Sequence, residues 1–325
     1  MTNRRQFLKN ASLATAAGVL AANSNLSAAA APANTMAGKS FGLQIYSLTV
    51  GEMRRGDREF SNDVQGGLKK VASMGYSTIE LAGYGFREGV ARIGAVPMAE
   101  FKKYADDAGL KIVSTHVNPP MGEYNRGNLE QAKEFWKRAT DHHAAIGCKY
   151  IIQPGQPATR STEEVELVGE AFNEAGKIAK AAGLQFAFHN HSGEFVRVVP
   201  RGREALPARW QWGAIPEGAK MIYDGMIEAT DPGLVQFELD VYWAVMGQQD
   251  PVAYMKKYPD RIRLLHIKDR AVLGETGMMN FQKIFETAYE INISDFFVEL
   301  EGYSGGQFNG VKGCADYLLN APFVK

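Results

Sequence analysis

The sequence predicts a single-domain (β/α)8 barrel, also called a TIM barrel, and three observations favour this fold. From Phe41 onward, short runs rich in β-branched and aromatic residues alternate with amphipathic stretches, as in repeated strand–helix units. Eight such runs can be counted, which fits a chain of 325 residues. No Gly-x-Gly-x-x-Gly turn follows the first run, so an open, dinucleotide-binding sheet is the less favoured alternative.

Regular spacing defines the predicted elements. The strands cover residues 41–47, 76–82, 110–118, 149–153, 184–191, 235–241, 262–268 and 296–300. The helices include residues 63–74, 98–108, 129–146, 162–182, 251–258 and 281–291. Ser161, with Glu164 at capping-box spacing, and Asp250 before Pro251 predict two helix starts. Glycines suited to a left-handed cap follow four helices: Gly75, Gly109, Gly147 and Gly183.

The composition argues against nucleic acid as a partner. Lysine plus arginine and aspartate plus glutamate both number 36, so the chain has no excess positive charge to attract phosphate backbones. This balance fits a small neutral substrate better. The two cysteines, Cys148 and Cys314, are too few for a disulfide scaffold, and we expect both to be buried thiols.

Residues 1–36 are expected to form an export signal and spacer, followed by the barrel over 37–325. The pair Arg4 and Arg5, with Lys9 after it, resembles the twin-arginine export motif and predicts a periplasmic location. The apolar run that follows has about a dozen residues, fewer than the roughly 20 that span a bilayer. We therefore expect cleavage and no stable membrane insertion.

An irregular insertion at about 192–217 interrupts the strand–helix alternation after the fifth predicted strand. Loops in this position line the catalytic face of a barrel, so the insertion is expected to be a lid or a substrate wall. Trp210 and Trp212 within it could stack on a sugar ring or anchor the loop to the barrel, and the sequence leaves both readings open.

Polar side chains are expected to face the barrel axis near the ends of the strands. Side chains alternate along a strand, so a phenylalanine or leucine packed under the helices turns its neighbours inward. The inward-facing residues predicted in this way are Glu80, His116, His189, His191, Glu238, Asp240, His266, Lys268, Glu299 and Glu301. His142 and His143 lie instead on a predicted helix, where solvated or capping roles are expected.

A mixed set of imidazoles and carboxylates predicts one divalent cation of manganese, zinc, cobalt or iron. The expected ligands lie on four successive strands and are His189, Asp240, His266 and Glu299. Other groups are expected to support these ligands or to contact the substrate: Glu80, His116, His191, Glu194, Lys268, Trp210, Trp212 and Trp243.

The order of five short motifs resembles the xylose-isomerase-like barrels across almost the whole mature chain. They are I-E-L at 79–81, F-H-N-H-S-G-E-F at 188–195, F-E-L-D-V-Y-W at 237–243, L-H-I-K-D at 265–269 and V-E-L-E at 298–301. The resemblance implies a metal site of glutamate, aspartate, histidine and glutamate, in which His189 replaces the first glutamate. It also implies that Trp243 stands where the AP endonucleases of this superfamily place a further zinc-binding histidine.

These features predict a metal-dependent sugar isomerase or epimerase that abstracts a proton next to a carbonyl. Glu299, His189 and His191 are the candidate bases, and Lys268 could donate to the developing oxyanion. A lyase or dehydratase and a non-catalytic sugar-binding barrel remain the alternatives. Export favours a non-phosphorylated sugar, keto-sugar or polyol. The sequence leaves open whether the chain forms a homo-oligomer and whether a partner oxidoreductase supplies its substrate.

Overall fold

The structure, a computed structural model, describes residues 38–56, 58–203, 215–303 and 305–325. The expected export signal over 1–36 lies outside these residues, as do Trp210 and Trp212. None of the helices in the described ranges is both long and apolar enough to cross a membrane.

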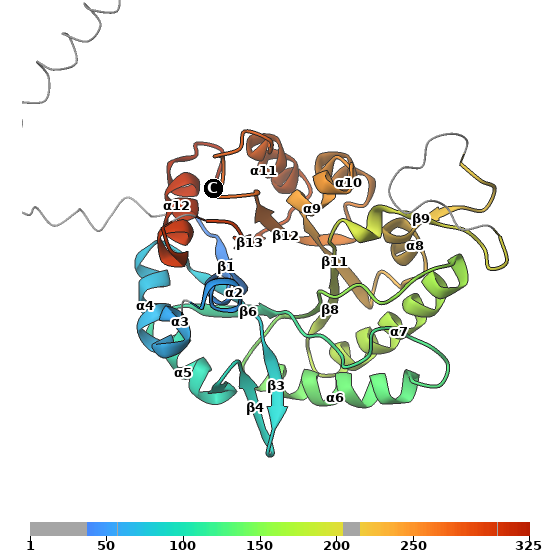
Figure 1. The fold of residues 1–325 in the computed structure, drawn as a ribbon, viewed down its shortest axis with the longest axis horizontal. Coiled ribbons are helices and arrows are strands. Elements are labelled where there is room, and N and C mark those ends of the chain that lie inside the picture. Colours follow the sequence, from blue (N-terminus) through green and yellow to red (C-terminus); the bar gives the residue numbers. More distant parts are fainter. Residues whose placement is uncertain (1–37, 57, 204–214, 304) are drawn as a thin grey trace, which may run out of the picture. The chain divides into compact units, whose positions relative to one another are not determined.

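Eight parallel strands surround the barrel axis, which confirms the predicted (β/α)8 fold (Figure 1). The strands are β1 (Gly42–Gln44), β2 (Thr78–Leu81), β6 (Lys111–Thr115), β7 (Tyr150–Gln153), β8 (Gln185–His189), β11 (Val235–Asp240), β12 (Ile262–Lys268) and β13 (Asp295–Glu299). They are hydrogen-bonded in the order β6-β2-β1-β13-β12-β11-β8-β7. The barrel closes between β6 and β7, where the Val117 N–H donates to the Ile152 carbonyl at 2.8 Å. Each strand falls on one of the eight predicted runs.

Helices flank the strands, most of them on the outside of the barrel (Figure 1). They are α2 (Tyr46–Arg55), α3 (Glu59–Asn62), α4 (Val64–Ser73), α5 (Met98–Asp107), α6 (Leu129–Ala145), α7 (Thr162–Ala181), α8 (Ile222–Glu228), α9 (Val241–Met246), α10 (Pro251–Lys257), α11 (Phe281–Glu290) and α12 (Gln307–Asn320). The six helices named from the sequence are confirmed, with both ends within one residue of the prediction. The other five were not predicted.

The predicted helix ends are also confirmed. The Ser161 side chain accepts a hydrogen bond from the Glu164 N–H, and the Asp250 side chain accepts one from the Val252 N–H. The four glycines at helix ends have positive φ, from 74° at Gly109 to 104° at Gly75. Glycine populates this left-handed region at little cost, so these residues stop each helix and turn the chain into the next strand.

Side chains on the strands divide between two cores, as the alternation predicted. Phe186 and Phe188 belong to the large core between strands and helices, and both rings lie within 5.4 Å of the Phe172 ring on α7. The intervening Ala187 faces the barrel axis. There it joins a compact apolar cluster, the apolar plug, formed by Val113, Tyr150, Ile152, Ala187, Leu264 and Phe297.

Two small antiparallel sheets extend the connections after β2 and β8. Strands β3 (Tyr84–Arg87), β4 (Val90–Ile93) and β5 (Val96–Pro97) follow β2 and were not predicted. The insertion predicted after the fifth strand contains a short 3-10 helix at Gly193–Phe195 and strand β9 (Arg197–Val198). Strand β9 pairs with β10 (Lys220–Met221), which lies just beyond the predicted insertion, in a two-stranded antiparallel ribbon.

The expectation for His143 was wrong. Its side chain is fully buried on α6, where Nδ1 contacts the Ala139 carbonyl at 2.7 Å and Nε2 contacts Thr115 Oγ1 at 3.1 Å. Burial lowers its pKa to about 4, so the ring is neutral at neutral pH. Helical periodicity could not reveal this, because the polar partner comes from β6, 28 residues away in sequence. Both cysteines are buried and free, as predicted.

Candidate functional site

Imidazole and carboxylate groups from neighbouring strands converge above the apolar plug. Two overlapping sets could each hold a cation, and within each set the ligand atoms lie within 4.8 Å of one another. The outer set consists of the four predicted ligands, His189, Asp240, His266 and Glu299. The inner set consists of His116, His189, Glu238 and His266.

Strand register explains this convergence. Glu238 on β11 pairs with His189 on β8, and Asp240 pairs with His266 on β12. Lys268 pairs with Glu299 on β13. Residues two apart on one strand share a face, so β11 and β12 each bring two polar side chains to the axis.

In the outer set, the carboxylates lie between an imidazole and an ammonium group. His266 Nδ1 is 3.3 Å from Glu299 Oε2 and 3.9 Å from Asp240 Oδ2. Lys268 Nζ is 2.7 Å from the same Glu299 oxygen and 3.9 Å from Asp240 Oδ2. Lys268 also pairs with Glu301. Asp240 Oδ1 accepts the Trp243 N–H at 2.8 Å and caps α9, whereas Asp240 Oδ2 is buried without a hydrogen-bond partner.

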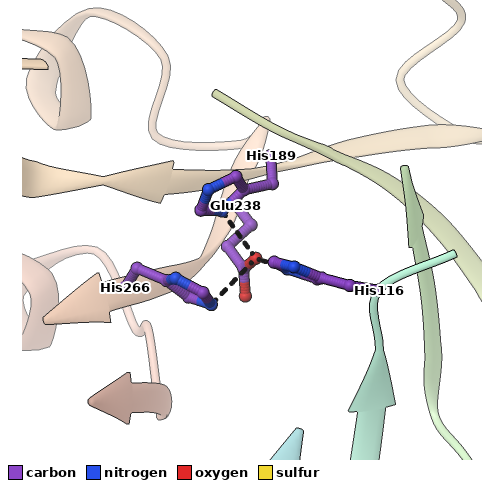
Figure 2. A group of neighbouring side chains, drawn as sticks. All are labelled: His116, His189, Glu238 and His266. Atoms are coloured by element: carbon purple, nitrogen blue, oxygen red, sulfur yellow. Dashed lines mark hydrogen bonds and ion pairs between the residues drawn. The ribbon is translucent and has the colours of Figure 1, made fainter. Parts of the chain in front are cut away.

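In the inner set, three imidazoles face one carboxylate oxygen, and Figure 2 shows them converging on Glu238. Glu238 Oε2 is 2.9 Å from His116 Nε2, 3.0 Å from His189 Nδ1 and 3.3 Å from His266 Nε2. The other oxygen, Glu238 Oε1, is buried without a hydrogen-bond partner. Glu80 lies beside this set, with its Oε1 2.7 Å from His266 Nε2 and 3.0 Å from His116 Nε2.

The residues fit a divalent cation. Nitrogen and oxygen donors of this kind suit manganese, iron, cobalt or zinc. Each set contains a buried carboxylate oxygen without a partner, and such an atom is costly unless a cation or donor satisfies it. The charge balance agrees. Glu80, Glu238, Asp240 and Glu299 are all buried, whereas Lys268 is the only buried lysine or arginine in the described ranges.

Burial and neighbouring charges determine the charge states around the outer set. Burial disfavours the charged form of Lys268, but Glu299 and Asp240 outweigh it, so the pKa of Lys268 lies above its usual value. Burial likewise opposes ionisation of Glu299, but Lys268 and His266 hold its pKa well below the usual range. Burial lowers the pKa of His191 to about 4. At neutral pH the site therefore contains an ammonium, an ionised carboxylate and a neutral imidazole.

A cavity of about 670 Å³ opens above this cluster. Its walls include Tyr46, Arg54, His116, His189, His191, Trp243, Glu299 and Glu301. A volume in this range accommodates a small organic ligand. The Trp243 ring lies 5.5 Å from the His191 ring and 5.0 Å from Lys268 Nζ, so an aromatic wall stands beside the polar floor.

Two residues expected to support ligands or contact substrate lie behind the cavity. Glu80 and Glu194 are fully buried and do not line it. Glu80 accepts hydrogen bonds from Gln44 Nε2 at 2.6 Å and Ser114 Oγ at 2.5 Å. Glu194 Oε2 accepts the His191 N–H at 2.9 Å. Neither carboxylate is among the residues that line the cavity, and both hold residues of the site in place.

Sequence reasoning missed other residues of the site. Tyr46 and Arg54 lie on α2, a helix that the sequence pattern did not reveal, and both line the cavity. Gln44 and Ser114 hold Glu80. Alternation along β1 would have turned Gln44 toward the axis, whereas the pairing of β2 with β6 is irregular, so alternation alone does not place Ser114.

The chain belongs to the xylose isomerase-like TIM barrel family, which it matches over residues 68–314. Among solved structures, it is similar to a sugar phosphate isomerase/epimerase from Parabacteroides distasonis. The two are 44% identical with a TM-score of 0.80, over 92% of this chain and 100% of that chain. The fold also resembles that of a 3-keto-D-glucoside 4-epimerase from E. coli, with 14% identity and a TM-score of 0.62, over 87% of this chain and 100% of that chain.

Curated relatives match over shorter segments. An inosose dehydratase from Geobacillus kaustophilus is 23% identical over 218 residues, which cover 62% of this chain and 60% of that protein. An inosose dehydratase from Salmonella agona is 31% identical over 122 residues, which cover 38% of this chain and 32% of that protein. The chain therefore spans less than two thirds of the length of either relative.

Proposed function

We propose that this protein is a metal-dependent sugar isomerase or epimerase that abstracts a proton next to a carbonyl. The observation that carries the proposal is the convergence of His189, Asp240, His266 and Glu299, with Lys268 against them, beneath a cavity of ligand size. Membership of the xylose isomerase-like family supports the same class of reaction. The twin-arginine-like segment motivates a periplasmic location.

His189 and His266, completed by Asp240 and Glu299, would hold one divalent cation. Such a cation polarises a carbonyl oxygen when bound and so acidifies the neighbouring C–H. The protein's own contribution is to orient the substrate between this polar floor and Trp243, which can pack against a sugar ring.

Two groups at the cavity are suited to accept the substrate proton. Glu299 is ionised because Lys268 and His266 lower its pKa, and it lines the cavity. His191 is neutral because burial lowers its pKa, and it lines the cavity too. Lys268 keeps its proton and can donate a hydrogen bond to a developing oxyanion. Return of the proton to another position or face completes isomerisation or epimerisation.

The walls favour a substrate without phosphate. Arg54 is the only lysine or arginine among the described residues that line the cavity, and its Nη2 is 2.9 Å from Glu301 Oε2. A phosphate group is usually bound by several unpaired cations or backbone N–H groups. We therefore infer a free sugar, keto-sugar or polyol, in agreement with the expected export.

A dehydratase is the second candidate, favoured by the similarity to two inosose dehydratases. It would begin with the same proton abstraction and continue with loss of a neighbouring hydroxyl. The two reactions differ in their products, because only elimination releases water and leaves a dehydrated sugar.

Proton exchange in deuterated water tests the proposal. The metal-loaded protein is incubated with a panel of free ketoses, keto-sugars and polyols, together with phosphorylated counterparts, and products are identified by NMR and mass spectrometry. We expect deuterium to enter one C–H next to the carbonyl of a non-phosphorylated substrate. Asp240→Asn, in which an amide replaces the carboxylate, is the matched control and should show no exchange. Absence of exchange across the panel would favour a non-catalytic sugar-binding barrel.

A further inference from the structure

The inner set has features of a cation site in its own right, although sequence reasoning did not select it. We infer that, in the substrate-free protein, a divalent cation binds to His116, His189, Glu238 and His266. The ion then lies one layer deeper than the outer set. The inference rests on the proposed metal dependence and concerns only where the ion lies before substrate binds.

The inner set has fewer hydrogens than close nitrogen–oxygen contacts. Five approaches of 2.7–3.3 Å join His116 Nε2, His189 Nδ1 and His266 Nε2 to oxygens of Glu80 and Glu238. Each ring nitrogen carries at most one hydrogen, so at most three hydrogens serve five approaches. Protonated rings would offset the carboxylate charges but would add no hydrogen at these contacts, so single N–H groups would have to be shared between oxygens. A cation bound to the nitrogen lone pairs and to Glu238 would account for the crowding.

Glu238 provides a second, independent observation. Its carboxylate is fully buried, one oxygen faces three imidazoles, and the other oxygen has no hydrogen-bond partner. Burying an ionised carboxylate is costly unless it is paired or coordinates a metal. A cation held by Glu238 would compensate that cost.

Net charge distinguishes the two sets. Every salt-bridge partner of Glu80 and Glu238 in the described part of the chain is a histidine. An imidazole that binds an ion through its nitrogen lone pair is neutral, so around a bound ion the inner set and Glu80 carry two negative charges, which a divalent cation neutralises. In the outer set, the Lys268 ammonium already neutralises part of the charge of Asp240, Glu299 and Glu301. An ion there would also lie close to the Lys268 ammonium, which repels it and has no counterpart in the inner set, so the inner position is electrostatically favoured.

The two positions exclude each other for a single ion. His266 presents Nε2 to the inner set and Nδ1 to Asp240 and Glu299, so a neutral ring can bind an ion on only one side. With the ion inside, the His266 Nδ1–H donates to Glu299. Before substrate binds, Asp240 and Glu299 are then not ligands of the ion, which the inner set alone holds.

Anomalous X-ray scattering from substrate-free crystals locates the ion directly. Wild-type protein is loaded with Co²⁺, and data are collected on both sides of the cobalt edge. We expect one peak within coordination distance of His116 Nε2 and Glu238 Oε2. A peak beside Asp240 and Glu299 instead would overturn the inner position and leave the proposed function intact. A wild-type protein that binds no divalent ion would overturn both.

A crossed pair of variants gives an independent readout in solution. His116 belongs only to the inner set and Asp240 only to the outer set, and both changes place a neutral amide there. We expect His116→Gln to weaken Co²⁺ binding by more than about tenfold, as measured by calorimetry. Losses of this size are typical when a group that binds or supports a metal is replaced. Asp240→Asn should change Co²⁺ binding by less than about threefold. The reverse pattern contradicts the inference, and where both variants lose affinity the crystallographic peak decides.

Discussion

The barrel interior contains two layers that are built from the same strands and have opposite chemistry. In the apolar plug, Ala187, Leu264 and Phe297 face the axis and are fully buried. Two residues further along each strand, the axis is lined by His189, His266 and Glu299. A step of two residues along a strand is about 7 Å, so the axis-facing side chains change from apolar to polar over that distance.

Burial alone does not separate these layers. Leu264 and His266 are both fully buried, yet Leu264 packs against apolar neighbours and His266 lies within 3.9 Å of four carboxylates. The difference lies in whether each buried polar atom has a partner. The plug contributes packing free energy, whereas the polar layer concentrates charge that a ligand or ion can satisfy. Changes in the two layers should therefore affect different measurements.

The largest effect is expected in the polar layer. Glu299→Gln removes the ionised carboxylate that contacts Lys268 and lines the cavity. We expect substrate C–H exchange in deuterated water to fall by about 10²–10⁴-fold, the usual contribution of a positioned base. The amide keeps the volume of the side chain, so circular dichroism should show a folded protein. Exchange within tenfold of wild type would exclude Glu299 as the base and direct attention to His191.

A substitution in the apolar plug should lower the stability of the fold and leave metal binding unchanged. Phe297→Ala leaves a cavity among fully buried neighbours and should lower the free energy of unfolding by about 3–5 kcal/mol, measured with urea. Met278→Ala, at a position that is 44% exposed, is the matched control and should change it by less than about 0.5 kcal/mol. Metal content per folded molecule should stay unchanged in both. Loss of metal in Phe297→Ala would mean that the two layers are coupled.

Alternation along strands explains how much could be predicted from the sequence. The barrel, its eight strands and the convergence of His189, Asp240, His266 and Glu299 all depend on a period of two, which local sequence encodes. The same rule turned Glu238 inward. It could not show that Glu238 meets three histidines, because that contact depends on side-chain rotamers and on the stagger between strands.

Short elements were missed for a different reason. Helix α9 has six residues, too few to show helical periodicity, and it begins where the Asp240 side chain caps it. Helix α2 directly follows β1, and its sequence, YSLTVGEMRR, combines β-branched residues with glycine. Local propensity is weak in such segments, and tertiary packing decides their structure.

A third prediction concerns Glu194, a carboxyl behind the polar layer. Burial raises its pKa to about 7 in the folded protein, from 4.5 for an unperturbed group. Between these values the folded state binds more protons than the unfolded state, so the free energy of unfolding falls as pH rises through this window. The shift corresponds to a loss of about 3 kcal/mol between pH 4.5 and pH 7.

Glu194→Gln removes this titration and keeps an oxygen to accept the His191 N–H. The variant should gain stability relative to wild type on going from pH 5 to pH 8, as measured by urea unfolding at both values. Glu290→Gln, at an exposed position on α11, is the control and should follow the wild-type profile. If Glu194→Gln also follows it, the carboxyl does not titrate in this window.

The smallest effect is expected at the rim, where Arg54 pairs with Glu301. The Arg54 side chain is 56% exposed, so solvent screens the pair, and such pairs contribute about 0.2–1 kcal/mol. Arg54→Met should therefore change the free energy of unfolding by less than about 1 kcal/mol and leave kcat on a free sugar nearly unchanged. Glu301 retains its contact with Lys268, so the floor of the cavity should stay in place. Among the described residues that line the cavity, Arg54 is the only lysine or arginine. A large rise in KM that is confined to a phosphorylated sugar would therefore show that Arg54 recognises phosphate. The inferred preference for free sugars would then be wrong.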